Sequence, residues 1–140
     1  MTDSFDGRCL CGDVRFSAKG DLVAVQCCHC RDCARWAGGA QISAMYAEGF
    51  EIDGPVRWYK SSDWGERGVC ARCGAALFWR MLDQSMINAA TGAFDDQTRF
   101  EKIDEHIYVD SKPAYYDFVD NAPRLTAAEV RARYGNTNVN

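Results

Sequence analysis

The chain has 140 residues, of which 47% are hydrophobic and 26% charged, and its formal net charge is −4. This length predicts a single domain at residues 1–135, followed by a disordered tail at residues 136–140. The acidic balance without a basic stripe argues against nucleic-acid binding. No stretch reaches the ~20 apolar residues of a membrane span. Because the N-terminus carries no secretory signal, we expect a cytoplasmic protein.

Short segments with strand-like patterns follow one another along the chain, separated by turns rich in Gly and Asp. The expected strands are Asp13–Ser17, Leu22–Gln26, Ala40–Ala47, Val56–Lys60, Ala75–Arg80, Met86–Ala90 and His106–Asp110. Helical signals are limited to Asp32–Ala37 and to a C-terminal segment that opens on the capping-box residues Thr126 and Glu129. The sequence therefore predicts a mostly β fold of small sheets with a short C-terminal helix.

The eight cysteines fall into three short groups, which are Cys9 and Cys11, then Cys27, Cys28, Cys30 and Cys33, and finally Cys70 and Cys73. In a cytoplasmic chain, clustered thiols favour metal binding over disulfides, which are the alternative interpretation. Spacings of two or three residues are typical of zinc ligands. The two outer pairs together supply four thiols, which predicts a structural zinc site. Four buried free thiols are the competing interpretation of these pairs.

The central group allows two ligand sets. Cys28, Cys30 and Cys33 form one set, and Cys27, Cys30 and Cys33 form another with equally acceptable spacing. Adjacent residues on an extended strand face opposite ways, so Cys27 and Cys28 are not expected to share a metal ion. Three ligands leave one coordination position of a tetrahedral zinc open, as in catalytic zinc sites.

The two histidines of the chain are not expected to be metal ligands. His29 alternates with its cysteine neighbours and points away from them. His106 lies in a strand-like segment and is expected to be a core residue or a residue that supports a ligand.

Four ordered motifs resemble those of the glutathione-dependent formaldehyde-activating enzyme family, which includes the centromere protein V group. The motifs are Gly7–Phe16, Cys28–Cys33, Arg67–Gly74 and His106–Lys112, and the resemblance extends over about residues 7–125. It implies a β-tent fold of small antiparallel sheets stapled by zinc. It assigns Cys9, Cys11, Cys70 and Cys73 to a structural zinc, and Cys28, Cys30 and Cys33 to a second zinc of the catalytic type. Two Zn²⁺ per chain are therefore expected. Val69 and Cys27 depart from the family pattern.

The resemblance also implies a function. It indicates a carbon–sulfur lyase that forms or breaks S-hydroxymethylglutathione, or a related thiol adduct, with glutathione as its small-molecule partner. Arg31, Arg35 and Lys60 are candidate cations for the carboxylates of glutathione. The alternative is a non-catalytic module, stapled by zinc, that binds a small-molecule thiol or a protein partner.

Overall fold

The computed structural model describes residues 5–135, which divide into two compact units. Unit 1 contains the residues up to 24 and residues 43–100, and unit 2 contains residues 25–42 and the residues from 101 onward. Strands β3 (Leu22–Cys28) and β4 (Gln41–Tyr46) each carry the chain from one unit into the other. The single domain expected at residues 1–135 stays a prediction, and the expected tail at residues 136–140 lies outside the described residues.

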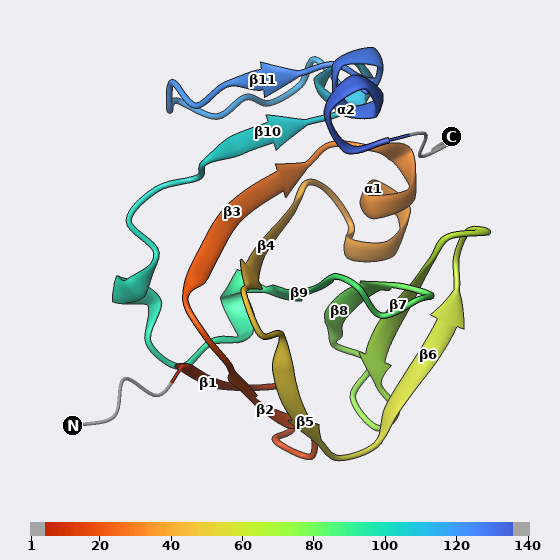
Figure 1. Ribbon diagram of the computed structural model, residues 1–140, viewed down its shortest axis with the longest axis vertical. Coiled ribbons are helices and arrows are strands. Elements are labelled where there is room, and N and C mark those ends of the chain that lie inside the picture. Colours follow the sequence, from red (N-terminus) through yellow and green to blue (C-terminus); the bar gives the residue numbers. More distant parts are fainter. Residues whose placement is uncertain (1–4, 136–140) are drawn as a thin grey trace. The chain divides into compact units, whose positions relative to one another are not determined.

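Unit 1 consists of antiparallel strands. One small sheet has the order β1-β2-β5, and a second group of strands follows the order β4-β9-β8-β7-β6. The elements are β1 (Phe5–Arg8), β2 (Arg15–Ala18), β5 (Phe50–Asp53), β6 (Val56–Lys60), β7 (Gly65–Cys70), β8 (Ala76–Met81) and β9 (Ile87–Ala90), followed by the 3-10 turns η1 (Thr91–Ala93) and η2 (Gln97–Arg99). Figure 1 shows β6 to β9 as a run of neighbouring strands in yellow-green and green.

Aromatic side chains fill the interior of unit 1. The ring of Phe16 makes edge contacts with the rings of Phe50, Phe78 and Phe94, at centroid separations of 5.7, 5.2 and 5.1 Å. Phe78 is completely buried and also stacks on Trp58 of β6. Edge-to-face aromatic pairs of this kind stabilise a core beyond the burial of their surface.

Strand β7 was missed by the sequence patterns because it contains two glycines, which normally weaken a strand. Both glycines are required by close aromatic neighbours. A Cβ atom on Gly65 would lie 2.9 Å from the ring of Trp79, and one on Gly68 would lie 2.9 Å from the ring of Trp58. The indole rings of β6 and β8 therefore occupy the space that side chains on β7 would need.

Unit 2 combines a small parallel sheet with two helices. Its elements are α1 (Arg31–Ala37), β10 (Glu105–Ile107), the 3-10 turn η3 (Val109–Ser111), β11 (Arg124–Leu125) and α2 (Ala127–Tyr134). Strand β10 pairs in parallel with both β3 and β11, and the three arrows point the same way in Figure 1. The expectation of antiparallel sheets is thus correct for unit 1 and needs correction for unit 2, because β10 reaches β3 through a long connection and not through a hairpin.

The mostly β class and the short C-terminal helix are confirmed. Thr126 accepts a hydrogen bond from the backbone N–H of Glu129, whose side chain accepts one from the backbone N–H of Thr126, so the predicted capping box is formed. Among the residues that the structure describes, neither helix has the length and apolar composition needed to cross a membrane.

Candidate metal centres

The four outer cysteines come together in unit 1. Their sulfur atoms all lie within 4.8 Å of one another, and we refer to Cys9, Cys11, Cys70 and Cys73 as the four-thiol cluster. The sulfur of Cys11 lies 3.6 Å from that of Cys9 and 3.8 Å from that of Cys70. A tetrahedral Zn²⁺ with Zn–S bonds of about 2.3 Å requires sulfur separations of about 3.8 Å. The two separations match this value, so the cluster could hold one Zn²⁺.

Backbone N–H groups point at the sulfurs of this cluster. Val14 N–H donates to the sulfur of Cys9 at 3.3 Å, and the N–H groups of Arg72 and Cys73 donate to the sulfur of Cys70 at 3.4 Å each. Backbone donors, led by that of Cys11, lower the pKa of Cys73 to about 6. Such donors favour the thiolate form, which is the form that binds metal.

Tight turns produce this arrangement. Gly12 and Gly74 adopt left-handed backbone conformations with φ of 86° and 77°. Gly74 N–H bonds to the carbonyl of Cys70 at 2.9 Å, which closes the turn that carries Cys70 and Cys73. Glycine adopts such φ values without the steric cost that other residues incur.

The second set of thiols lies in unit 2, on one short segment. Cys28 ends β3, Cys30 is the N-cap of α1, and Cys33 lies in the first turn of α1. Their sulfur atoms lie within 4.8 Å of one another, and we refer to these residues as the three-thiol cluster. The hydrogen-bonded thiols of Cys30 and Cys33, together with burial, raise the pKa of Cys28 well above its usual value. Thiolates this close repel one another, and a divalent cation offsets that repulsion, so the cluster fits a Zn²⁺ ion with three protein ligands.

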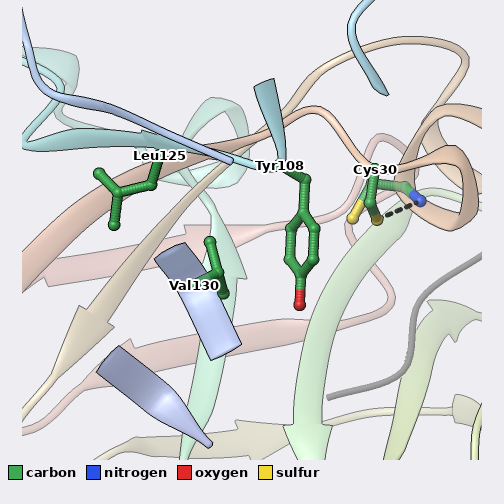
Figure 2. Packing of buried hydrophobic residues seen from close by; sticks show 5 residues of the cluster. Cys30, Tyr108, Leu125 and Val130 are labelled. Atoms are coloured by element: carbon green, nitrogen blue, oxygen red, sulfur yellow. Dashed lines mark hydrogen bonds between the residues drawn. The ribbon is translucent and has the colours of Figure 1, made fainter. Parts of the chain in front are cut away.

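An apolar cover packs against the three-thiol cluster. Cys30 and Cys33 belong to a buried cluster with Tyr108, Leu125 and Val130. Figure 2 shows the ring of Tyr108 beside Cys30, with Val130 and Leu125 on the other side of the ring. Tyr108 adopts a left-handed backbone conformation with φ of 57°, which is unfavourable for a residue with a bulky side chain. The aromatic ring beside the thiols is therefore carried by a residue with a strained backbone conformation.

Two buried histidines and a half-buried aspartate form a hydrogen-bonded chain next to this segment. His29 Nε2 lies 2.8 Å from His106 Nδ1, and His106 Nε2 lies 3.0 Å from the carboxylate of Asp120. Both rings are almost fully buried. Burial, and then the adjacent His106, lower the pKa of His29 to about 4. Partial burial raises the pKa of Asp120, but the hydrogen bonds from His106 and from the Ala122 N–H, together with the nearby positive charges, leave the pKa lowered.

Cys27 is fully buried on the same side as the histidines, as its alternation with Cys28 predicted. Its sulfur lies within 4.8 Å of ring nitrogens of His29 and His106. Burial, with a smaller effect of Asp120, raises the pKa of Cys27 to about 12. The structure therefore places Cys27 with the two histidines and apart from the three-thiol cluster.

The sequence patterns missed two features of this site. Asp120 gave no signal, because its partner His106 lies on another strand-like segment. Tyr108 was expected inside a strand that runs to Asp110, whereas β10 ends at Ile107 and the chain turns there. Of the candidate cations, Arg31 and Arg35 lie on α1 in unit 2, and Lys60 is an exposed residue of unit 1.

Three comparisons identify what this chain is similar to. The family model described as "Glutathione-dependent formaldehyde-activating enzyme" matches residues 4–111, which include both thiol clusters. A Schizosaccharomyces pombe protein named "Uncharacterized lyase C29B12.13" is 27% identical over 133 residues, which cover 90% of this chain and 93% of that protein. The crystal structure of a Rhodobacter sphaeroides protein aligns with a TM-score of 0.53 at 14% identity, covering 70% of this chain and 96% of the other, and supports the fold alone.

The family match covers most of the chain and contains all seven clustered cysteines. The chain therefore belongs to the glutathione-dependent formaldehyde-activating enzyme family.

Proposed function

We propose that this protein is a zinc-dependent carbon–sulfur lyase that forms and breaks S-hydroxymethylglutathione or a related thiol adduct. The observation that carries the proposal is the three-thiol cluster, which offers three ligands and not four. A zinc ion held by three protein ligands keeps one coordination position for a substrate. Family membership and the lyase name of the Schizosaccharomyces pombe relative support the reaction class.

The residues divide between two tasks. Cys9, Cys11, Cys70 and Cys73 would hold a structural Zn²⁺, and Cys28, Cys30 and Cys33 would hold a second. When bound at the three-thiol cluster, Zn²⁺ lowers the pKa of a thiol at its remaining position.

The protein itself orients the sulfurs and limits access of water. The N–H of Cys33 donates to the sulfur of Cys30 at 3.2 Å, which fixes the orientation of that side chain. Tyr108, Leu125 and Val130 pack against the cluster and exclude water from one side of it. Electrostatic interactions strengthen when water is excluded, so this cover favours ionised sulfur at the metal.

The proposed reaction balances without a further reactant. The sulfur of glutathione forms a bond to the carbonyl carbon of formaldehyde, and the thiol proton passes to the carbonyl oxygen. The lyase direction breaks the same carbon–sulfur bond and returns the thiol and the aldehyde.

The test must separate catalysis from the spontaneous combination of the two reactants. Exchange NMR on an equilibrium mixture of glutathione and formaldehyde gives the interconversion rate without protein, with the wild-type chain and with Cys30→Ser. We expect faster exchange with the wild type and the spontaneous rate with Cys30→Ser. Cys27→Ser is the matched control, since it removes a neighbouring thiol outside the cluster, and it should keep both the rate and the metal content. Loss of one zinc in Cys27→Ser, with none lost in Cys28→Ser, would contradict the proposed ligand set.

The alternative is a non-catalytic module that binds a small-molecule thiol or a protein partner. The burial of Cys30 and Cys33 in an apolar cluster favours it, because structural zinc sites are closed to solvent. Glutathione binding by calorimetry without faster exchange would identify this module.

The proposed partner and location follow from the thiols. Seven thiols that must stay reduced to bind metal fit a cytoplasmic protein, where glutathione is abundant. The acidic net charge of −4 favours small-molecule partners over nucleic acid.

A further inference from the structure

Unit 2 contains a pocket of about 240 Å³ that is separate from the three-thiol cluster. Its lining includes Arg31, Ala34 and Arg35 of α1, and Pro113, Tyr115 and Tyr116 from the segment after η3. Residues at these helical spacings share one face of α1, whereas Cys33 points from a different face toward the thiols. Ligand pockets for whole small molecules measure roughly 300–1,000 Å³. This pocket, which we call the arginine pocket, is therefore large enough for one arm of a ligand.

Within residues 5–135, the side chains of Arg31 and Arg35 have no counterion. Neither makes a hydrogen bond or an ion pair with this part of the chain, and both are exposed. Two like charges one helical turn apart repel each other, and an anion between them removes that repulsion. The planar guanidinium group binds carboxylates with two parallel hydrogen bonds.

A buried histidine nitrogen at the same pocket lacks a partner. An ionised Asp120 accepts from the Nε2–H of His106, so in neutral rings His106 Nδ1 accepts from the Nε2–H of His29. His29 Nδ1 is then an unprotonated acceptor. It is buried and has no hydrogen-bond partner in the described part of the chain, and His29 lines the pocket. A buried acceptor without a donor is costly, and a ligand N–H would satisfy it.

We propose that the arginine pocket binds a carboxylate-bearing arm of the thiol substrate, with Arg31 and Arg35 on the carboxylate and His29 Nδ1 accepting an adjacent N–H. Its identification as a substrate subsite rests on the proposed function. Glutathione offers this chemistry at both ends: a carboxylate beside an ammonium group on the γ-glutamyl arm, and a carboxylate beside an amide N–H on the glycyl arm.

The probe that isolates the pocket is S-methylglutathione, which has both arms and no free thiol. Calorimetry should show that Arg31→Gln and Arg35→Gln each weaken its binding about tenfold, the effect of losing a charged hydrogen bond. Arg131→Gln is the matched control, since Arg131 is an exposed residue of α2 outside the pocket and the change in charge is the same. Equal affinity in all four proteins, or no binding to the wild type, would overturn the proposal. The S-methyl derivatives of γ-glutamylcysteine and of cysteinylglycine, compared in the same way, show which arm depends on the arginines.

The histidine contact has its own readout. The chain has two histidines, so ¹⁵N-histidine labelling yields four ring-nitrogen signals. On addition of S-methylglutathione, the His29 Nδ1 signal should shift toward that of a hydrogen-bonded acceptor, while the signals of His106 stay in place. An unchanged His29 signal in the bound protein would contradict its role as acceptor.

These results are independent of the lyase test. In one outcome, S-methylglutathione binding depends on the arginines but formaldehyde exchange is no faster. This result would support the proposed arginine pocket and contradict the proposed lyase activity. In the other outcome, exchange is faster and the KM for glutathione is unchanged in Arg31→Gln and Arg35→Gln. This result would support the lyase activity and contradict the role of the arginine pocket.

Discussion

The two thiol clusters are both built from cysteines, but they differ in how far apart these cysteines lie in the sequence. The four-thiol cluster joins segments that are far apart in sequence, with Cys11 and Cys70 separated by 59 positions. The three-thiol cluster lies within one strand end and the first turn of one helix. Closing a long loop costs conformational entropy, which metal binding at the first cluster must offset, whereas the second cluster closes almost no loop. We therefore expect a metal ion to contribute folding energy at the first cluster and chemistry at the second.

The largest expected effect is at the four-thiol cluster. Cys70→Ser should leave the chain largely unfolded or insoluble, because a structural zinc contributes on the order of 10 kcal/mol in small zinc domains. Circular dichroism melts and elemental analysis of the purified variant measure the outcome, and Cys9→Ser should behave in the same way. A folded Cys70→Ser chain would show that the first cluster does not hold the fold together.

The next effect is on metal content and activity without loss of the fold. Cys30→Ser should lose about one of two zinc ions and keep a cooperative thermal transition, because its cluster joins no distant segments. Elemental analysis and the same melts decide this. Collapse equal to that of Cys70→Ser would mean that both clusters are structural, in favour of the binding module.

A third test disturbs the four-thiol cluster without touching sulfur. Gly54 has φ of 112°, and a Cβ atom there would lie 2.2 Å from the carbonyl oxygen of Asp13. Val14, the next residue, donates its N–H to Cys9, so Gly54→Ala should displace this ligand and destabilise the fold by about 2–4 kcal/mol.

Gly38→Ala is the matched control for this change. Gly38 also has a positive φ, of 87°, but in residues 5–135 no atom beyond Gly38 and its two chain neighbours lies within 4 Å of an added Cβ. It should cost about 1 kcal/mol from backbone strain alone. Denaturant titrations give the free energy of unfolding of both variants. Equal decreases would show that the contact with Asp13 does not contribute to the destabilisation.

The smallest effect concerns the cover of the three-thiol cluster. Thr126→Ala removes the N-cap of α2, whose Val130 packs in that cover, and should cost about 1 kcal/mol of unfolding free energy. Thr126→Ser keeps the hydroxyl and should restore most of the loss. Thermal melts measure stability, and unchanged zinc content would show that the cover is not needed to hold the metal.

The same cap has a defined pH dependence. The backbone N–H of Thr126, and then its side chain, lower the pKa of Glu129 below the ordinary value of 4.5. A lowered pKa in the folded state means that this contribution is complete above pH 4.5 and is lost as the pH falls through the lowered value. Glu129→Gln should remove that part of the acid sensitivity, and an unchanged acid titration would contradict it.

The sequence was sufficient for the features that depend on neighbours in the chain. The strand at Val56–Lys60 and the capping box at Thr126 were predicted correctly, because their signals are local. The convergence of the two outer cysteine pairs was expected from their spacing, whereas the choice of Cys28 over Cys27 in the central group came from the family resemblance. The zinc ions that they would hold stay a prediction.

Other features that depend on distant partners could not be predicted. Strand β7 was not predicted because Gly65 and Gly68 accommodate indole rings from neighbouring strands, and no local pattern reveals such rings. The chain from His29 through His106 to Asp120 depends on the parallel pairing of β10 with β3, which is a property of the folded sheet.

That pairing also has a consequence during synthesis. His29 and His106 are 77 positions apart, so at about 5–20 residues per second the ribosome adds His106 and Tyr108 several seconds after the thiol segment. During this interval Cys28, Cys30 and Cys33 have no cover from β10 or α2. The supply of zinc to the nascent chain, compared with the rate of thiol oxidation, should therefore determine how much newly made protein carries metal at the second cluster.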